Sequence, residues 1–133
     1  MSLAANNGGT NDTTTVLVVE DEALICEMIS QALQEHGFRV CAVANAGDAL
    51  RYLIDGLPAD VLFTDINLPG EMDGALLAQR ARDMRPDLPV VFASGRLSLL
   101  DQLRGVPRAA CLPKPYSPLH ACEVVEELVA TAH

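Results

Sequence analysis

Val16-Leu17-Val18-Val19-Glu20-Asp21-Glu22 is the stretch that decides the fold. Its first four residues are a continuous run of β-branched and apolar side chains, which is typical of a parallel strand covered on both faces. Acidic residues follow this run directly. In an open α/β sheet, ligands bind beyond the carboxyl ends of the strands. The stretch therefore predicts both a buried strand and a polar site at its carboxyl end.

Similar apolar runs recur along the chain and alternate with helical patterns. Further strands are predicted at residues 38–44, 61–64, 90–93 and 109–112. Helices are predicted at residues 22–36, 46–54, 74–85 and 97–103, and from Pro118 onward after the N-cap residue Ser117. Five β-α units in strict alternation predict a parallel sheet with helices on both faces. An unrelated α/β domain with another strand order is the alternative.

Apolar spacing also predicts which helical side chains face the core. In the first helix these are Leu24, Ile25, Met28, Ile29, Ala32 and Leu33. In the second and third helices they are Ala46, Ala49, Leu50, Leu53, Ile54, Leu77, Ala81 and Met84, and in the last helix Cys122, Val125, Leu128 and Val129. Gly37 is expected to end the first helix.

The composition indicates a single globular domain. The chain has 133 residues, of which 50% are hydrophobic and 20% are charged. Residues 1–14 are small and polar, so we expect a flexible N-terminal tail before a domain at 15–131. The net charge of −9 argues against binding to nucleic acid or to an anionic membrane. Neither a membrane-spanning run nor a secretion signal is found in the sequence.

The four cysteines, Cys26, Cys41, Cys111 and Cys122, form no C-x-x-C motif and no ligand set with the three histidines. We expect buried free thiols in a reducing cytoplasm, with disulfides or a metal site as the alternative.

Carboxylate, hydroxyl and ammonium side chains, which could form a reactive site, follow four of the predicted strands. Glu20 and Asp21 follow the first strand, Asp65 the third, Ser94 the fourth and Lys114 the fifth. Each has a purely structural explanation: acids favour helix starts, an aspartate can open a turn, a serine can cap, and a lysine can lie at the surface. Together they predict one site, because the carboxyl ends of parallel strands meet at one edge.

Such a site suits phosphoryl chemistry. Carboxylates held close together raise one another's pKa unless a cation neutralises them, and oxygen ligands favour Mg²⁺. A carboxylate can attack phosphorus to give an acyl phosphate, while the metal offsets the charge on the phosphoryl oxygens. A lysine and a hydroxyl would complete the contacts of the phosphate.

Five motifs in order resemble the response-regulator receiver family over about residues 15–131. They are residues 16–22, Phe63-Thr64-Asp65-Ile66-Asn67-Leu68-Pro69, Met72-Asp73-Gly74, Phe92-Ala93-Ser94-Gly95 and Leu112-Pro113-Lys114-Pro115-Tyr116. The resemblance implies a flavodoxin-like (βα)5 three-layer sandwich with a parallel five-stranded sheet in the order 2-1-3-4-5. It also implies a cytoplasmic protein of a two-component system.

The resemblance assigns the metal and phosphate roles. Asp65 matches the phosphoacceptor. Glu20 and Asp21 match the acidic pair that holds Mg²⁺, with Asp21 favoured as the direct ligand and Glu20 expected to act through water. Asn67 matches the position whose backbone carbonyl completes the metal site.

The resemblance also assigns switch residues, and the sequence departs from the family there. Ser94 matches the switch hydroxyl and Lys114 the phosphate-binding lysine, whose bond to Pro115 is often cis in the family. Cys111 stands where many members carry an aromatic residue that moves with the hydroxyl. The motif at residues 92–95 is similar to the Phe-Ala-Thr-Gly subgroup, in which an aromatic residue commonly stands at the position of Arg96. The relay roles of Arg96 and Cys111 therefore stay open, with a surface position favoured for Arg96.

The resemblance implies a signalling phosphoacceptor rather than an enzyme. Its partners would be a sensor histidine kinase or histidine phosphotransfer protein upstream, and an effector protein or domain downstream that meets the fourth strand, fourth helix and fifth strand. A phosphorylation-independent interaction module on the same fold is the alternative. Asp65-Ile66-Asn67 fits an aspartate-based phosphatase poorly, because that motif normally follows the first strand and ends in Asp. A flavin-binding site is disfavoured, because no Ser/Thr/Gly-rich phosphate loop follows the first predicted strand. A stand-alone receiver and a fragment of a hybrid kinase or larger regulator are both compatible with the sequence.

Overall fold

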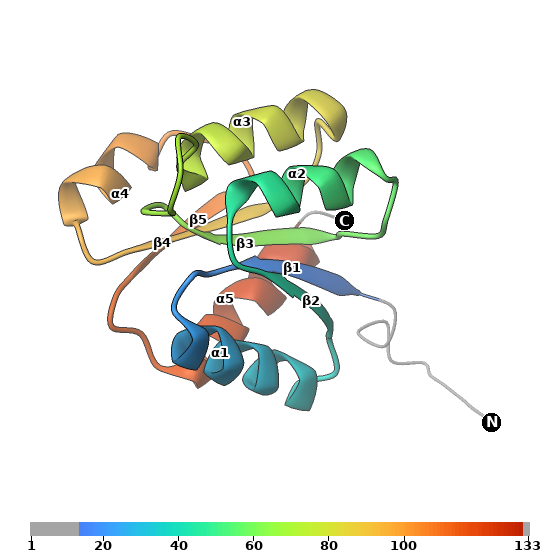
Figure 1. The fold of residues 1–133 in the computed structure, drawn as a ribbon. Helices are drawn as coiled ribbons and strands as arrows, with labels where there is room; N and C mark the ends of the chain where they lie inside the picture. Colours follow the sequence, from blue (N-terminus) through green and yellow to red (C-terminus); the bar gives the residue numbers. More distant parts are fainter. Residues whose placement is uncertain (1–13, 132–133) are drawn as a thin grey trace.

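The structure, a computed structural model, describes residues 14–131 and is built around one five-stranded parallel sheet (Figure 1). The strands are β1 (Thr15–Val19), β2 (Arg39–Val43), β3 (Val61–Asp65), β4 (Val90–Ser94) and β5 (Ala109–Pro113). The helices are α1 (Ala23–Glu35), α2 (Ala46–Ile54), α3 (Gly74–Met84), α4 (Leu97–Leu103) and α5 (Pro118–Thr131). The strand order is β2-β1-β3-β4-β5, so the predicted flavodoxin-like fold is confirmed.

Most of the predicted N-terminal tail, residues 1–13, lies outside the described residues. Thr14 belongs to the folded part: it is buried, and its carbonyl accepts a hydrogen bond of 2.8 Å from the backbone N–H of Arg39.

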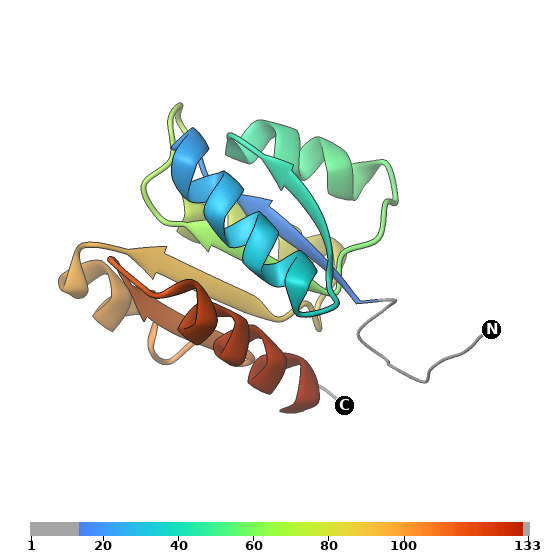
Figure 2. The ribbon, with the colours of Figure 1, turned by 90° about the horizontal axis from the view of Figure 1, so that it is seen from below.

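The helices cover the two faces of the sheet unequally. Helices α2, α3 and α4 lie on one face, and α1 and α5 lie side by side on the other (Figures 1 and 2). Successive residues of a strand point to opposite faces, so Val16 and Val18 pack with α1 and α5 while Leu17 and Val19 pack toward α2, α3 and α4. This two-sided burial explains why β1, β3 and β4 are apolar without alternation.

Four of the predicted core side chains are exposed, and these predictions were wrong. Leu24 is 82% exposed, Ile54 66%, Met84 40% and Met28 38%. Leu24 lies in the first turn of α1, while Ile54 and Met84 end α2 and α3, so the ends of the helices run past the sheet. The buried residues of α1 are Ile29 and Leu33, toward its middle and end.

Local signals end and begin the helices as the sequence predicts. Gly37 adopts a φ of +90° just after α1, a conformation that glycine reaches without steric cost. The Ser117 hydroxyl oxygen accepts a 3.0 Å hydrogen bond from the backbone N–H of His120 and so caps α5.

All four cysteines are free thiols, as expected. Only Cys122 is fully buried, whereas Cys26, Cys41 and Cys111 are half-buried. Within residues 14–131, each helix is too short or too polar to cross a bilayer.

Candidate functional site

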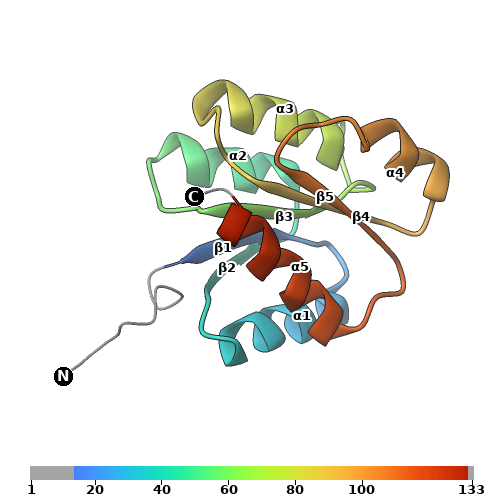
Figure 3. The same cartoon turned by 180° about the vertical axis from the view of Figure 1, so that it is seen from behind.

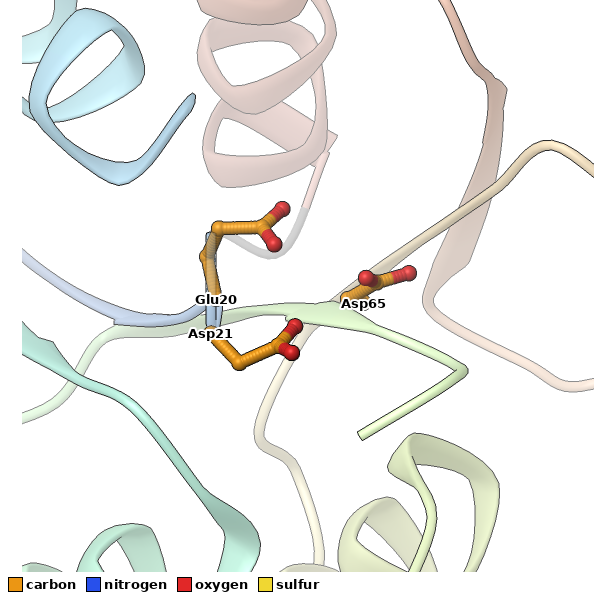
Figure 4. A group of neighbouring side chains, drawn as sticks. All are labelled: Glu20, Asp21 and Asp65. Atoms are coloured by element: carbon orange, nitrogen blue, oxygen red, sulfur yellow. The ribbon is translucent and has the colours of Figure 1, made fainter. Parts of the chain in front are cut away.

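The parallel sheet brings the predicted site residues to its carboxyl edge. Glu20 and Asp21 follow β1, Asp65 ends β3, Ser94 ends β4 and Lys114 follows β5. Strands β1 and β3 are hydrogen-bonded neighbours, with Val19 paired to Thr64. The carboxylates that follow these two strands therefore face one small region (Figure 4).

Three carboxylates make up an acidic cluster, which is Glu20, Asp21 and Asp65. One carboxylate oxygen from each lies within 4.8 Å of the others. Glu20 and Asp65 are buried, at 5% and 7% exposed, whereas Asp21 is exposed. A cluster of oxygen donors with one open side fits a hard cation such as Mg²⁺, which retains water ligands.

A single ammonium group links the two buried carboxylates. The Nζ of Lys114 donates to Oε1 of Glu20 at 2.9 Å and to Oδ2 of Asp65 at 3.1 Å. The second oxygen of Glu20, Oε2, accepts a 3.1 Å hydrogen bond from the backbone N–H of Glu22. Three carboxylates and one ammonium leave two negative charges uncompensated when all four groups are ionised.

Burial is the largest single influence on the pKa of each of these groups, but it decides the direction of the shift only for the two carboxylates. Desolvation raises the pKa of Glu20 and of Asp65 above their ordinary values, although their hydrogen bonds to Lys114 act in the opposite direction. Burial alone would lower the pKa of Lys114, but its bonds to Glu20 and Asp65 outweigh that effect and raise it. The ammonium form of Lys114 is thus secured, and the carboxylates favour a further cation.

The loop between β3 and α3 is tied to Asp65. The backbone N–H of Gly74 donates to the Ile66 carbonyl at 2.8 Å, and the backbone of Asn67 acts to lower the pKa of Asp65 against the larger effect of burial. Farther along, the Asp73 side chain caps α3 by accepting a 2.8 Å bond from the backbone N–H of Leu76. The carbonyl of Asn67, the predicted backbone ligand, thus belongs to a loop held at both ends.

The predicted switch residues lie on β4, β5 and the adjoining loops. Ser94 is fully buried, its Oγ accepts a 3.0 Å bond from the backbone N–H of Arg96, and its carbonyl accepts a 2.9 Å bond from that of Lys114. The peptide bond between Lys114 and Pro115 is cis. Cys111 donates its thiol hydrogen to the carbonyl of Leu100, at a distance of 3.5 Å, and so connects β5 to α4.

Arg96 is exposed and directly precedes α4. Its side chain makes no hydrogen bond or ion pair within residues 14–131, which agrees with the surface position favoured for it.

Two residues beside Asp65 received no role from the sequence. The Thr64 hydroxyl donates a 2.8 Å hydrogen bond to the backbone carbonyl of Asp65. Gly74 lies so close to the same carbonyl that a Cβ there would be 2.1 Å from its oxygen. The sequence signals were a threonine within an apolar strand and a glycine after an N-cap aspartate. Neither signal indicates that both residues contact the Asp65 carbonyl.

Sequence and structure comparisons show which known proteins this chain resembles. The family described as "Response regulator receiver domain" matches residues 16–126. The transcriptional regulator NtrC of Azospirillum brasilense is 33% identical over 114 residues, which are 84% of this chain and 23% of NtrC. The sensor kinase CckA of Brucella abortus is 32% identical over 118 residues, 86% of this chain and 12% of CckA. The chain thus spans less than a quarter of either relative.

Solved structures agree with the sequence matches. A response regulator receiver protein from Sinorhizobium medicae superposes with a TM-score of 0.84 at 31% identity, covering 90% of this chain and 97% of that one. A CheY-like receiver domain from Methanospirillum hungatei gives 0.78 at 26% identity, covering 90% and 95%. The chain therefore belongs to the response regulator receiver domain family.

Proposed function

We propose that Asp65 accepts a phosphoryl group from a phosphohistidine in an Mg²⁺-dependent step of a two-component phosphorelay. The observation that carries this proposal is the excess of carboxylates over ammonium groups at the carboxyl edge of the sheet. Glu20 and Asp65 are both buried and bonded to Lys114, and of the two Asp65 ends β3, the middle strand of the sheet. In this role the chain is a signalling phosphoacceptor and not an enzyme with a separate substrate.

Each residue of the site would have a separate role in the transfer. An Asp65 carboxylate oxygen attacks phosphorus, the P–N bond of the donor histidine breaks, and the imidazole leaves. Asp21, Asp65 and the backbone carbonyl of Asn67 would hold Mg²⁺, with Glu20 acting through water. When bound, the ion offsets the negative charge on the phosphoryl oxygens. Lys114 lies 3.1 Å from Asp65 and would bind a phosphoryl oxygen after the transfer.

The signal would leave the site through β4, α4 and β5. Ser94 ends β4, and its hydroxyl would turn toward the phosphoryl group. Arg96 directly precedes α4, and the Cys111 thiol bonds to Leu100 in the middle of α4. A shift at Ser94 would therefore reach α4 through the chain itself at Arg96, while Cys111 keeps β5 attached to α4. An effector protein or domain would read this face.

The donor would dock on the neighbouring apolar surface. A groove of about 390 Å³ beside the site is lined by Ile25, Met28, Lys114, Pro115 and Tyr116. The groove lies between α1 and the loop from β5 to α5. Figure 3 shows α1 and α5 on the same face of the sheet. Leu24, 82% exposed on the first turn of α1, extends the apolar surface.

A histidine kinase or histidine phosphotransfer protein that placed an apolar helix here would bring its phosphohistidine to Asp65. The cytoplasm is the location that such a donor implies.

The test is phosphorylation by acetyl phosphate in the presence of Mg²⁺, followed by the intact mass. Wild type is expected to gain one phosphoryl group, while Asp65→Asn and wild type in EDTA gain none. The matched control is Asp101→Asn, which removes an exposed carboxylate on α4 and is expected to be labelled like wild type. An unlabelled wild type, or equal labelling of Asp65→Asn, would overturn the proposal.

Binding of Mg²⁺ separates this function from a phosphorylation-independent interaction module. A receiver that has lost its phosphoacceptor role is expected to bind no Mg²⁺ at the acidic cluster. Calorimetric titration of wild type and Asp21→Asn measures this, and loss of binding in the variant supports the phosphoacceptor.

A further inference from the structure

The backbone carbonyl of Asp65 is held from two sides by residues that do not belong to the acidic cluster. Thr64 precedes it on β3, and Gly74 begins α3. Both meet the peptide that joins Asp65 to Ile66. This peptide leads from the Asp65 carboxylate to the Asn67 carbonyl, two of the groups that the proposed function assigns to Mg²⁺.

Thr64 supplies a hydrogen bond that an apolar residue would not. Its side chain is fully buried, and its Oγ1 donates to the Asp65 carbonyl oxygen at 2.8 Å. A buried carbonyl that loses its donor tends to move until it finds another one. Valine has nearly the same shape as threonine and is common in such a strand, yet it would leave this carbonyl without its donor.

Gly74 closes the other side by direct contact. A Cβ on Gly74 would lie 2.1 Å from the Asp65 carbonyl oxygen and 2.9 Å from both its carbonyl carbon and the Cα of Ile66. The backbone N–H of Gly74 donates to the Ile66 carbonyl at 2.8 Å. The first residue of α3 therefore rests directly on the peptide, which has little room to rotate.

We infer that Thr64 is a positioning residue for phosphoryl transfer: its hydroxyl, with Gly74 opposite, fixes the peptide that aims the Asp65 carboxylate and the Asn67 carbonyl. Rotation of this peptide would shift the Asn67 carbonyl relative to the Asp65 carboxylate. The inference rests on the proposed function, because it assigns a purpose to the geometry of those two groups. It predicts a loss of Mg²⁺ affinity as well as a loss of rate.

The experiment compares Thr64→Val, which removes the hydroxyl at constant shape, with Thr64→Ser, which retains it. Thr15→Val is the matched control, because Thr15 is a buried threonine at the opposite end of the neighbouring strand. Calorimetry gives the Mg²⁺ dissociation constant without phosphorylation, and acetyl phosphate gives the initial rate of labelling at saturating Mg²⁺. Thr64→Ala, measured at 10 °C, replaces Thr64→Val if the latter does not fold.

Thr64→Val is expected to weaken Mg²⁺ binding and to slow labelling, each by roughly 5- to 10-fold, the scale of one lost buried hydrogen bond. Thr64→Ser and Thr15→Val are expected to stay within about twofold of wild type. Wild-type values for Thr64→Val, or an equal loss in Thr15→Val, would overturn the inference. A wild type that takes no phosphate would instead overturn the proposed function, so the two failures are distinct.

Discussion

The two edges of the sheet use charged side chains in opposite ways. At the amino edge, Arg82 donates to the backbone carbonyls of Leu88 and Arg108, and Arg85 donates to those of Leu53 and Leu57. There each cation donates to backbone carbonyls beside the loops that precede β3, β4 and β5, and the carbonyls of Leu53 and Arg108 also accept backbone bonds from Gly56 and Val90. At the carboxyl edge, buried charges meet one another, and carboxylates outnumber ammonium groups. The charged side chains of the amino edge thus stabilise the fold. The carboxyl edge instead keeps an excess of negative charge, which Mg²⁺ would neutralise when a phosphoryl group binds.

The largest expected effect comes from removing Lys114, the cation that is bonded to the acidic cluster. Lys114→Met is expected to slow labelling by acetyl phosphate about 100-fold. The variant loses the ammonium group whose positive charge would stabilise the phosphoryl oxygens during the transfer. The same variant is expected to bind Mg²⁺ at least as tightly as wild type, since it leaves three carboxylates without an ammonium. Labelling kinetics and calorimetry measure the two effects.

Arg104→Met is the control for Lys114→Met, because Arg104 is an exposed cation paired with Asp101. Parallel losses of rate and Mg²⁺ affinity in Lys114→Met would contradict the assigned role of Lys114.

The amino edge is expected to respond in stability instead. Arg85→Met removes bonds of 3.2 and 2.7 Å to the carbonyls of Leu53 and Leu57, and is expected to lower the free energy of unfolding by about 2 kcal/mol. Urea denaturation measures this change, and labelling of the folded variant should match wild type. Arg80→Met, on the exposed surface of α3, is the control and should unfold like wild type. An Arg85→Met variant that unfolds like wild type but is labelled slowly would contradict this difference between the two edges.

The carboxyl edge is expected to gain stability when a charge is removed. Burial raises the pKa of Asp65 in the folded protein, so the folded state binds more protons than the unfolded state above the ordinary value of 3.8. The contribution of Asp65 to the free energy of unfolding therefore falls as the pH rises from 3.8 through the raised pKa of the folded protein. At pH 7 in EDTA, Asp65→Asn is therefore expected to be more stable than wild type.

Two measurements check the origin of this gain in Asp65→Asn. The difference from wild type should shrink as the pH falls toward the ordinary value of 3.8 and disappear well below it, where the carboxylate is protonated in both states. Asp101→Asn, which alters an exposed ion pair, should show no gain. A destabilised Asp65→Asn in EDTA would mean that Lys114 already balances the site.

The smallest expected difference lies between the two tyrosines. The Tyr116 hydroxyl, near the carboxyl edge, is buried without a hydrogen-bond partner among the described residues. The Tyr52 hydroxyl, near the amino edge, donates to the carbonyl of Pro58 at 2.5 Å. Tyr52→Phe is expected to lower the free energy of unfolding by about 1 kcal/mol, whereas Tyr116→Phe should leave it unchanged or raise it slightly. Thermal melts of the two variants check this order, and its reversal would contradict the comparison.

The fold was predictable because few topologies satisfy five alternating β-α units with strands buried on both faces. That topology also gave the edge where Glu20, Asp21, Asp65, Ser94 and Lys114 gather. The exposure of Leu24 and Met84 was not predictable, because apolar spacing identifies a face of a helix but not where the helix outruns the sheet.

The finer contacts of the site depend on three-dimensional approach and not on spacing. The sequence placed Lys114 near the phosphate position, but not its simultaneous bonds to Glu20 and Asp65. Nor did it connect Thr64 and Gly74, ten positions apart, to the same carbonyl. Contacts of this kind form only when α3 packs onto the end of β3.

The most direct test of the central claim is to locate the phosphoryl group itself. The protein is labelled with acetyl phosphate and Mg²⁺, and the acyl phosphate is reduced with borohydride, which converts a phosphorylated aspartate to homoserine. Peptide mass mapping then identifies the changed residue. Homoserine is expected at position 65 and at no other aspartate. Homoserine at Asp21 or at another aspartate, with Asp65 unchanged, would contradict this assignment.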